Sequence, residues 1–174
     1  MPSSFRPSLR LRTASVPVLA LALATLAGAL HAQPVRSERN ISLELANRLA
    51  AATVASCQAG GHAVTATVVD RAGNVRAVQR ADNAGPHTLA ASAQKAFTSA
   101  SARNTTLAMM DNALKNPAAS NLVHIPGFLL LGGGVPVRAG GEVIGAIGVG
   151  GAPGGHLDEQ CAMAALEQAK DALQ

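Results

Sequence analysis

A glycine-rich stretch over residues 132–162 limits the folds open to this chain more than any other feature. It runs GGGVPVRAGGEVIGAIGVGGAPGGHLDEQCA. Residues 135–137 and 142–149 are β-prone, and the pair Gly140-Gly141 suits a tight turn between antiparallel strands. The stretch therefore predicts a hairpin, then a glycine loop, then a helix that runs to the C-terminus.

Four glycines cluster where the second strand of this hairpin ends. Without Cβ atoms, they accept positive φ angles or let another group lie directly against the backbone. That group is either a ligand or a neighbouring helix, and the sequence leaves both open. The four are Gly145, Gly148, Gly150 and Gly151.

The last helix has its own start signal. Asp158 is predicted to be its N-cap, and Glu159 places negative charge in the first turn. Its apolar face is then formed by Ala162, Leu166, Ala169 and Leu173, which recur at helical spacing.

Residues 1–32 are predicted to be a secretory signal peptide. Three arginines precede an uncharged apolar run of about fifteen residues, which is shorter than the roughly 20 that span a membrane. The predicted cleavage site follows Ala32, with residues 27–29 as the alternative. We therefore expect a periplasmic or secreted domain over residues 33–174, with no stable membrane insertion.

Removal of this leader changes the charge balance. Three of the fourteen basic residues lie in it, and all ten acidic residues lie beyond it, so eleven basic residues face ten acidic ones and the net charge is +1. The chain has no Trp or Tyr and only three Phe. Without a basic cluster or stacking aromatics, nucleic-acid binding is not expected. The alanine-rich core also favours an oligomer, because alanine buries little area.

The remaining segments predict an α+β fold, a central antiparallel sheet of about five strands with helices packed on it. Residues 118–126 show no regular pattern. The other predicted elements are a helix capped by Ser42 and ending at Gly60, strands at 64–70 and 74–80, helices at 87–103 and 107–115, and a short strand at 128–131.

The two cysteines, Cys57 and Cys161, fall on the first and last predicted helices. An exported protein permits a disulfide between them. The alternative is two separate buried thiols, since free cysteine is among the most buried residue types. On sequence grounds we favour the separate thiols.

The histidines of the mature chain are spread singly, so no zinc motif is predicted. A haem iron needs only one axial imidazole. His87, at a helix start, and His124, in the irregular segment, are the best-placed candidates for that role.

One charged group stands near the first hairpin: Arg80, Asp82 and Lys95. It either binds ligand carboxylates or forms a solvated ion pair. The loop before the last helix similarly either binds an anion at the helix N-terminus or is capped by its own acids. No nucleophile elbow or catalytic carboxylate pair is recognisable, so binding is favoured over catalysis.

Four segments together resemble the GlcG/HbpS haem-binding family, also called the haem-degrading domain and found as the C-terminal domain of PduO-type proteins. The resemblance covers essentially all of the mature chain. The segments are SLELANRLAAA, VTATVVDRAGNVRAVQRADNA, SAQKAFTSA and GGVPVRAGGEVIGAIGVGGAPGGHLDEQCAMAAL.

The resemblance implies an α/β sandwich, assembly into tetramers or octamers, and binding of haem or, in some members, a corrinoid. Two positions depart from the family pattern: Asn83 stands where a glycine is usual, and Gly151 where a serine is usual. Family members also sit among genes for small-acid metabolism. A binding protein or enzyme for a small carboxylate is therefore the alternative hypothesis.

From the residues and the resemblance we predict an exported haem-binding protein in haem sensing, storage or degradation. Its pocket is expected near residues 80–95 and the loop 145–156. His87 or His124 would ligate the iron, and Arg80 and Lys95 would meet the propionates. The further predicted contacts are Asp82, Gly148, Gly150, Gly151, His156, Asp158 and Glu159.

Overall fold

The computed structural model describes residues 35–174, so the predicted signal peptide and its cleavage site lie outside the described residues. Residues 38–174 form one compact unit. The helices and strands are α1 (Leu43–Ala59), β1 (Thr65–Asp70), β2 (Val75–Arg80), α2 (His87–Ala102), α3 (Thr106–Lys115), the 3₁₀ helix η2 (Pro117–His124), β3 (Gly134–Ala139), β4 (Glu142–Gly150), α4 (Gly155–Gln168) and the 3₁₀ helix η3 (Lys170–Leu173).

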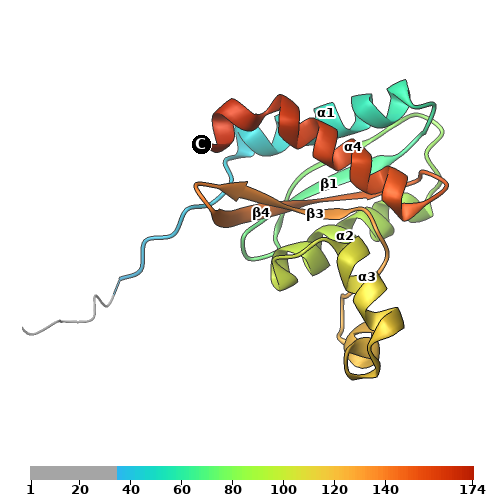
Figure 1. Cartoon of the computed structure of the whole chain (residues 1–174). Helices are drawn as coiled ribbons and strands as arrows, with labels where there is room; N and C mark the ends of the chain where they lie inside the picture. Colours follow the sequence, from blue (N-terminus) through green and yellow to red (C-terminus); the bar gives the residue numbers. More distant parts are fainter. Residues whose placement is uncertain (1–34) are drawn as a thin grey trace, which may run out of the picture. The chain divides into compact units, whose positions relative to one another are not determined.

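In the described part of the chain the sheet has four antiparallel strands in the order β2-β1-β4-β3. Figure 1 shows α1 and α4 on one face and α2 on the other. The α+β fold with a central antiparallel sheet is therefore confirmed. No helix among residues 35–174 has the length and hydropathy to cross a bilayer.

Local signals account for most of the element ends. The Ser42 hydroxyl accepts from the Leu45 amide at 3.1 Å, and Thr105 caps α3 in the same way at 3.2 Å. Gly140 and Gly141 have φ angles of +56° and +84°, which two-residue hairpin turns require. Both hairpins and the predicted cap of α1 are confirmed.

The predicted fifth strand, at residues 128–131, is wrong. The Leu129 amide donates to the Thr98 hydroxyl at 2.8 Å, and the Leu131 carbonyl accepts from Thr106 at 2.7 Å. Side chains of α2 and α3 thus satisfy this backbone in place of a strand partner. The preceding segment, without a visible pattern in the sequence, forms η2, whose first turn is capped by Asn116.

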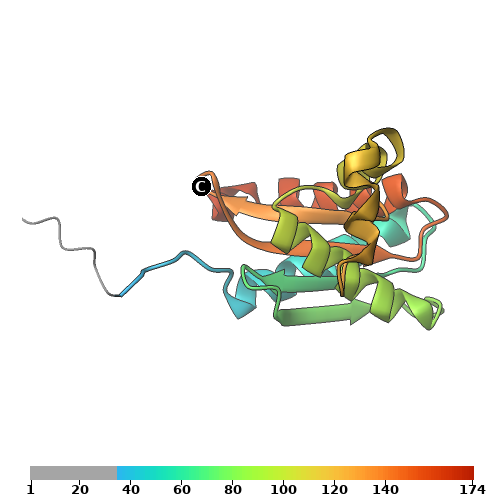
Figure 2. The ribbon, with the colours of Figure 1, turned by 90° about the horizontal axis from the view of Figure 1, so that it is seen from below.

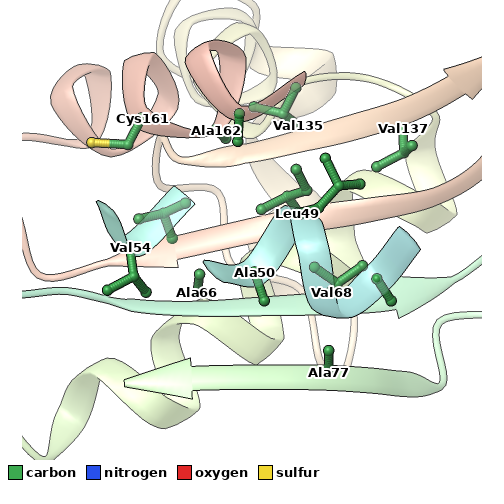
Figure 3. Close-up of a cluster of buried hydrophobic side chains, with 14 of the residues drawn as sticks. Leu49, Ala50, Val54, Ala66, Val68, Ala77, Val135, Val137, Cys161 and Ala162 are labelled. Atoms are coloured by element: carbon green, nitrogen blue, oxygen red, sulfur yellow. The ribbon is translucent and has the colours of Figure 1, made fainter. Parts of the chain in front are cut away.

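The main hydrophobic core lies between the sheet and the helix pair α1–α4 (Figure 3). Leu49 and Ala50 of α1 meet Val68 of β1 and Val137 of β3 there, all fully buried. Much of the rest is alanine, which lets helices and strands approach closely. Because α1 and α4 share this face, their mutual contact closes the core.

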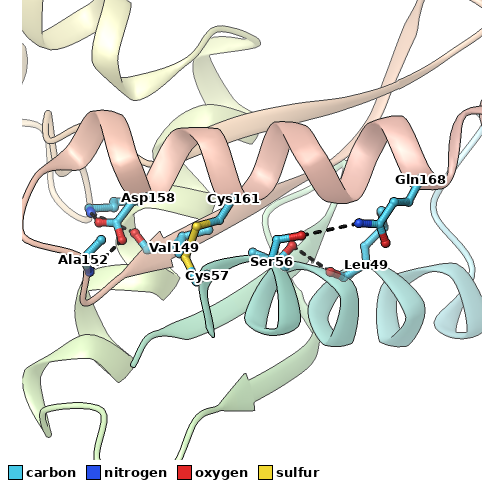
Figure 4. The surroundings of a disulfide bond; sticks show 10 residues. Leu49, Ser56, Cys57, Val149, Ala152, Asp158, Cys161 and Gln168 are labelled. Atoms are coloured by element: carbon cyan, nitrogen blue, oxygen red, sulfur yellow. Dashed lines mark hydrogen bonds and ion pairs between the residues drawn. A yellow bond between two sulfur atoms is a disulfide. The ribbon is translucent and has the colours of Figure 1, made fainter. Parts of the chain in front are cut away.

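A disulfide joins these two helices. Cys57 of α1 and Cys161 of α4 are bonded, with their Cα atoms 5.3 Å apart (Figure 4). The favoured prediction of two separate thiols is therefore wrong. The helices pack side by side and antiparallel over the same sheet face, so the end of α1 meets the start of α4 and brings together cysteines 104 residues apart in the sequence.

Reduction of this disulfide is expected to lower the free energy of unfolding by about 2 to 4 kcal/mol, because the bond restricts the unfolded chain over a long loop. Denaturant unfolding with and without dithiothreitol measures the change. A Cys57→Ala/Cys161→Ala variant should show the lower stability in both conditions. Equal stability of oxidised and reduced wild-type protein would contradict the prediction.

Candidate functional site

Several predicted site residues meet at one end of the sheet. Thr65, the first residue of β1, pairs with Arg80 of β2 on one side and with Gly150 of β4 on the other. The Thr65 hydroxyl also contacts that of Thr88, in the first turn of α2, at 2.7 Å. This end of the sheet therefore gathers Arg80, the start of α2 with His87, and the Gly150-Gly151 corner.

The loop from β2 to α2 is tightly folded. Asn83 has a φ of +63°, so it takes the backbone conformation for which glycine is favoured. The Arg80 guanidinium donates to the Ala84 carbonyl, which ties the end of β2 to this loop. Asp82 and His87 are exposed, and the His87 ring lies back against Gly85.

Helix α2 fills the space above the strand glycines. A Cβ atom on Gly148 would lie 2.0 Å from the Ser92 carbonyl oxygen and 2.4 Å from the Ala96 nitrogen. The sequence allowed either a ligand or a helix against these glycines. At Gly148 the structure shows that the group is helix α2. Gly151 has a φ of +134°, and a Cβ there would lie 2.6 Å from the Ala63 carbonyl. That position has no room for the serine usual in the family.

Lys95 of α2 does not join Arg80 and Asp82. Its side chain is 2% exposed, and its ammonium donates to Asp158 Oδ2 and to the Val149 carbonyl, both at 2.8 Å. The charged group predicted from the sequence is thus divided, because residue 95 faces the sheet while Arg80 and Asp82 face solvent. Lys95 and Asp158 form a buried ion pair between α2 and α4.

Asp158 is not the N-cap of the last helix, because α4 begins earlier, at Gly155. Its second carboxylate oxygen accepts from the Ala152 amide at 3.0 Å, so Asp158 also fixes the loop between β4 and α4 (Figure 4). Burial raises the pKa of Asp158, and the contacts with Lys95 oppose that rise. Its role is to hold α2, α4 and this loop together.

Glu159 faces the start of α3. Burial raises the pKa of this carboxyl, and hydrogen bonds from the Leu107 amide and the Thr105 hydroxyl oppose the rise. One of its oxygens, Oε2, is buried without a hydrogen-bond partner. Glu159 thus supports the packing of α4 on α3.

The remaining histidines stand apart. His156, in the first turn of α4, is exposed with its ring against Gly154. His124 is exposed at the end of η2, three residues before Gly127, whose backbone lies by the Phe97 ring. The same ring covers Gly73, at the end of β1 opposite to Thr65. His87 and His124 are therefore not brought together.

The face of β2 beside α2 is uncovered. Val75 and Val78 are 55% and 45% exposed. Val78 lies opposite Thr67, whose hydroxyl contacts Ser92 of α2, so Val78 points to the α2 face. Figure 2 shows α2 crossing the sheet obliquely, with β2 at the margin.

Leu89 extends this apolar surface onto α2. Ala91 of α2 lies against Gly150 of β4. Residues two positions apart in an α-helix differ by 200° around its axis, so Leu89 is on the opposite flank of α2, toward β2. It is 46% exposed. We call the surface of Val75, Val78, Arg80 and Leu89 the open β2 strip. It combines apolar side chains with a guanidinium at the His87 end. Of these residues the sequence had singled out Arg80 alone, and no motif pointed to Val75, Val78 or Leu89.

Metal-ligating side chains do not cluster in residues 35–174: no three His, Cys, Asp or Glu side chains gather there. Five surface hollows are lined by residues other than the predicted site residues. The largest of these five, about 350 Å³, lies at the β3 edge of the sheet.

Comparisons with known proteins agree with the fold described above. The family described as "Haem degrading protein HbpS-like" matches residues 41–167. Protein GlcG of Escherichia coli (strain K12) is 34% identical over 109 residues, which cover 63% of this chain and 80% of that protein. A crystal structure of a double mutant of Streptomyces reticuli HbpS is 35% identical, with a TM-score of 0.73, covering 90% of this chain and 98% of that one.

A more distant structure shares the fold alone. The crystal structure of a PduOC:Heme complex is 22% identical, with a TM-score of 0.66. The match covers 74% of this chain and 94% of that chain.

Removal of one partner of the buried ion pair is expected to cost about 3 to 5 kcal/mol of unfolding free energy, since it leaves an uncompensated buried charge. Lys95→Met and Asp158→Leu should each show this loss in denaturant unfolding. The double variant should be less destabilised than Lys95→Met alone.

The control is Lys115→Met, which breaks an exposed pair with Asp111 whose atoms are 3.9 Å apart. Such surface pairs contribute about 1 kcal/mol or less. A loss for Lys95→Met no larger than that of Lys115→Met would show that the buried pair does not stabilise the fold.

Proposed function

The chain belongs to the family of HbpS-like haem-degrading proteins, and on that premise we propose that it binds haem on the open β2 strip. The observation that carries this proposal is the strip itself, an uncovered apolar surface with Arg80 at its His87 end. Haem has a flat apolar ring and two carboxylates, so it needs both kinds of surface. Val75, Val78 and Leu89 would contact the ring, and Arg80 a propionate.

His87 is our proposed iron ligand. It is exposed at the same end of the sheet as Arg80, and its imidazole lies on the surface where an iron can reach it. Lys95 is not part of this contact set, because Asp158 and Val149 already occupy its ammonium. Bound haem would supply a redox-active iron, and the chain would supply the apolar surface, the cation and the ligand.

A small carboxylate at the start of α4 has less support. The Ala152 amide of that loop already donates to Asp158, and Glu159 accepts from the Leu107 amide at the start of α3. A corrinoid would meet the same open strip as haem and remains the alternative ligand.

Haemin titration of the mature protein tests the proposal. The wild-type protein should give a shifted and sharpened Soret band with saturable binding. His87→Ala should lose that band shape, and Val78→Asp should weaken binding at least tenfold by placing charge under the ring. Arg80→Gln should weaken it about two- to fivefold, as expected for an exposed charge pair.

His124→Ala and His156→Ala are the matched histidine controls, and both should bind as the wild type does. Unchanged spectra and affinity for His87→Ala and Val78→Asp would place haem elsewhere on the protein. Failure of the wild-type protein to bind haemin at all would end the haem proposal, and titration with a corrinoid would then test the alternative.

We further propose that the protein is exported and self-associates. The Cys57–Cys161 disulfide supports export, because such bonds persist in oxidising compartments. Self-association is supported by exposed apolar side chains on the α3–η2 region and the segment that follows it, where charge is sparse. They are Leu114, Val123, Ile125 and Leu131.

Native mass spectrometry of protein recovered from the periplasm of an expressing bacterium tests both points. The subunit mass should correspond to a chain starting at Gln33, with two hydrogens fewer than the reduced form, and the assembly should be a tetramer or octamer. Leu114→Asp/Val123→Asp should reduce it to smaller species. A full-length reduced subunit would contradict export, and a wild-type monomer would contradict assembly.

A further inference from the structure

The largest of the five hollows is an apolar groove at the opposite edge of the sheet from the open β2 strip. We call it the β3 groove; it has a volume of about 350 Å³ and is lined by Thr105, Val135, Pro136, Arg138, Met163, Leu166 and Leu173. We propose that it binds an amphipathic anion, a carboxylate with an unbranched apolar tail. The inference does not rest on haem binding.

The lining is suited to an apolar chain. Met163 and Leu166 project from one face of α4, and Val135 and Pro136 belong to β3, so the groove lies between a helix and a strand edge. Met163 is 52% exposed, and its flexible thioether adapts to ligands of varied shape. The volume lies at the lower end of the range of ligand pockets, about 300 to 1,000 Å³.

The strand edge itself disfavours a peptide as an added strand. The Val149 amide donates to the Gly133 carbonyl, so residues 133, 135 and 137 direct their backbone groups to β4, and residues 134 and 136 direct theirs outward. Pro136 has no N–H, and the Gly134 amide already donates to Thr106 at 2.8 Å. Neither outward position offers a donor, so β-strand addition is disfavoured.

Charge at the rim selects the head group. The exposed Arg138 guanidinium donates to the Arg103 carbonyl at 2.8 Å, and it forms no ion pair with a carboxylate in residues 35–174. A guanidinium carries five N–H donors, so Arg138 retains further donors for a carboxylate. Glu159 is hydrogen-bonded to Thr105, so the side of the groove lined by Thr105 is unfavourable for the anionic head group of a ligand. The ligand carboxylate is therefore directed to Arg138, with its tail along Met163 and Leu166.

Calorimetric titration with decanoate, below its micelle concentration, and with decanol tests this inference on the purified full-length mature protein. The wild type should bind decanoate at least fivefold more tightly than decanol. Arg138→Gln should lower decanoate affinity five- to twentyfold and leave decanol affinity unchanged. Met163→Asp should lower the affinity for both, and Arg76→Gln, an exposed arginine on β2, is the control that should bind as the wild type does.

Three results would overturn the inference. The first is equal binding of decanoate by wild type and Arg138→Gln. The second is competition between haemin and decanoate, which would make the groove the haem site. The third is dissociation of an oligomer by Met163→Asp, because the groove would then be a contact between subunits. Haemin binding by Arg138→Gln, measured in parallel, should be normal, so failure here and failure of the haem proposal are separable.

Discussion

The close approach of α2 to β4 is the constraint on which the rest of the structure depends. At Gly148 the helix backbone occupies the place where any side chain would stand. Because the helix lies this low, Thr88 and Ser92 reach the threonine hydroxyls of β1, and Lys95 reaches the carbonyl of Val149 and the carboxylate of Asp158. A larger residue at 148 would lift α2 and separate all of these contacts at once.

The oblique position of α2 also produces one of the two open surfaces. By covering β1, β4 and part of β3, the helix leaves β2 exposed on that face, and the open β2 strip results. At the other margin, the β3 groove lies between β3 and α4, with Thr105 at the start of α3 as part of its wall. Both proposed binding surfaces are thus margins of one sheet, and each has an arginine: Arg80 on β2 and Arg138 on β3.

The sequence predicted the features that local chemistry determines. Gly140-Gly141 defined a hairpin, and Ser42 defined a helix start. The sequence did not reveal contacts between residues that are far apart in the chain. Residues 128–131 carry an apolar pattern typical of a strand, but their backbone bonds to the side chains of Thr98 and Thr106. The spacing of apolar residues does not show which hydrogen-bond partners a backbone segment has. Lys95 and Asp158 are separated by 63 residues, and nothing near either residue identifies its partner.

The bond between Cys57 and Cys161 joins the first helix of the fold to the last. Between these two cysteines lie all four strands of the sheet and helices α2 and α3. A protease that cut the backbone once, anywhere in this covalent ring, would leave a nicked but undivided molecule, with both pieces still held at the α1–α4 contact. The loops of this protein can therefore be broken without immediate loss of either half, provided that its surroundings stay oxidising.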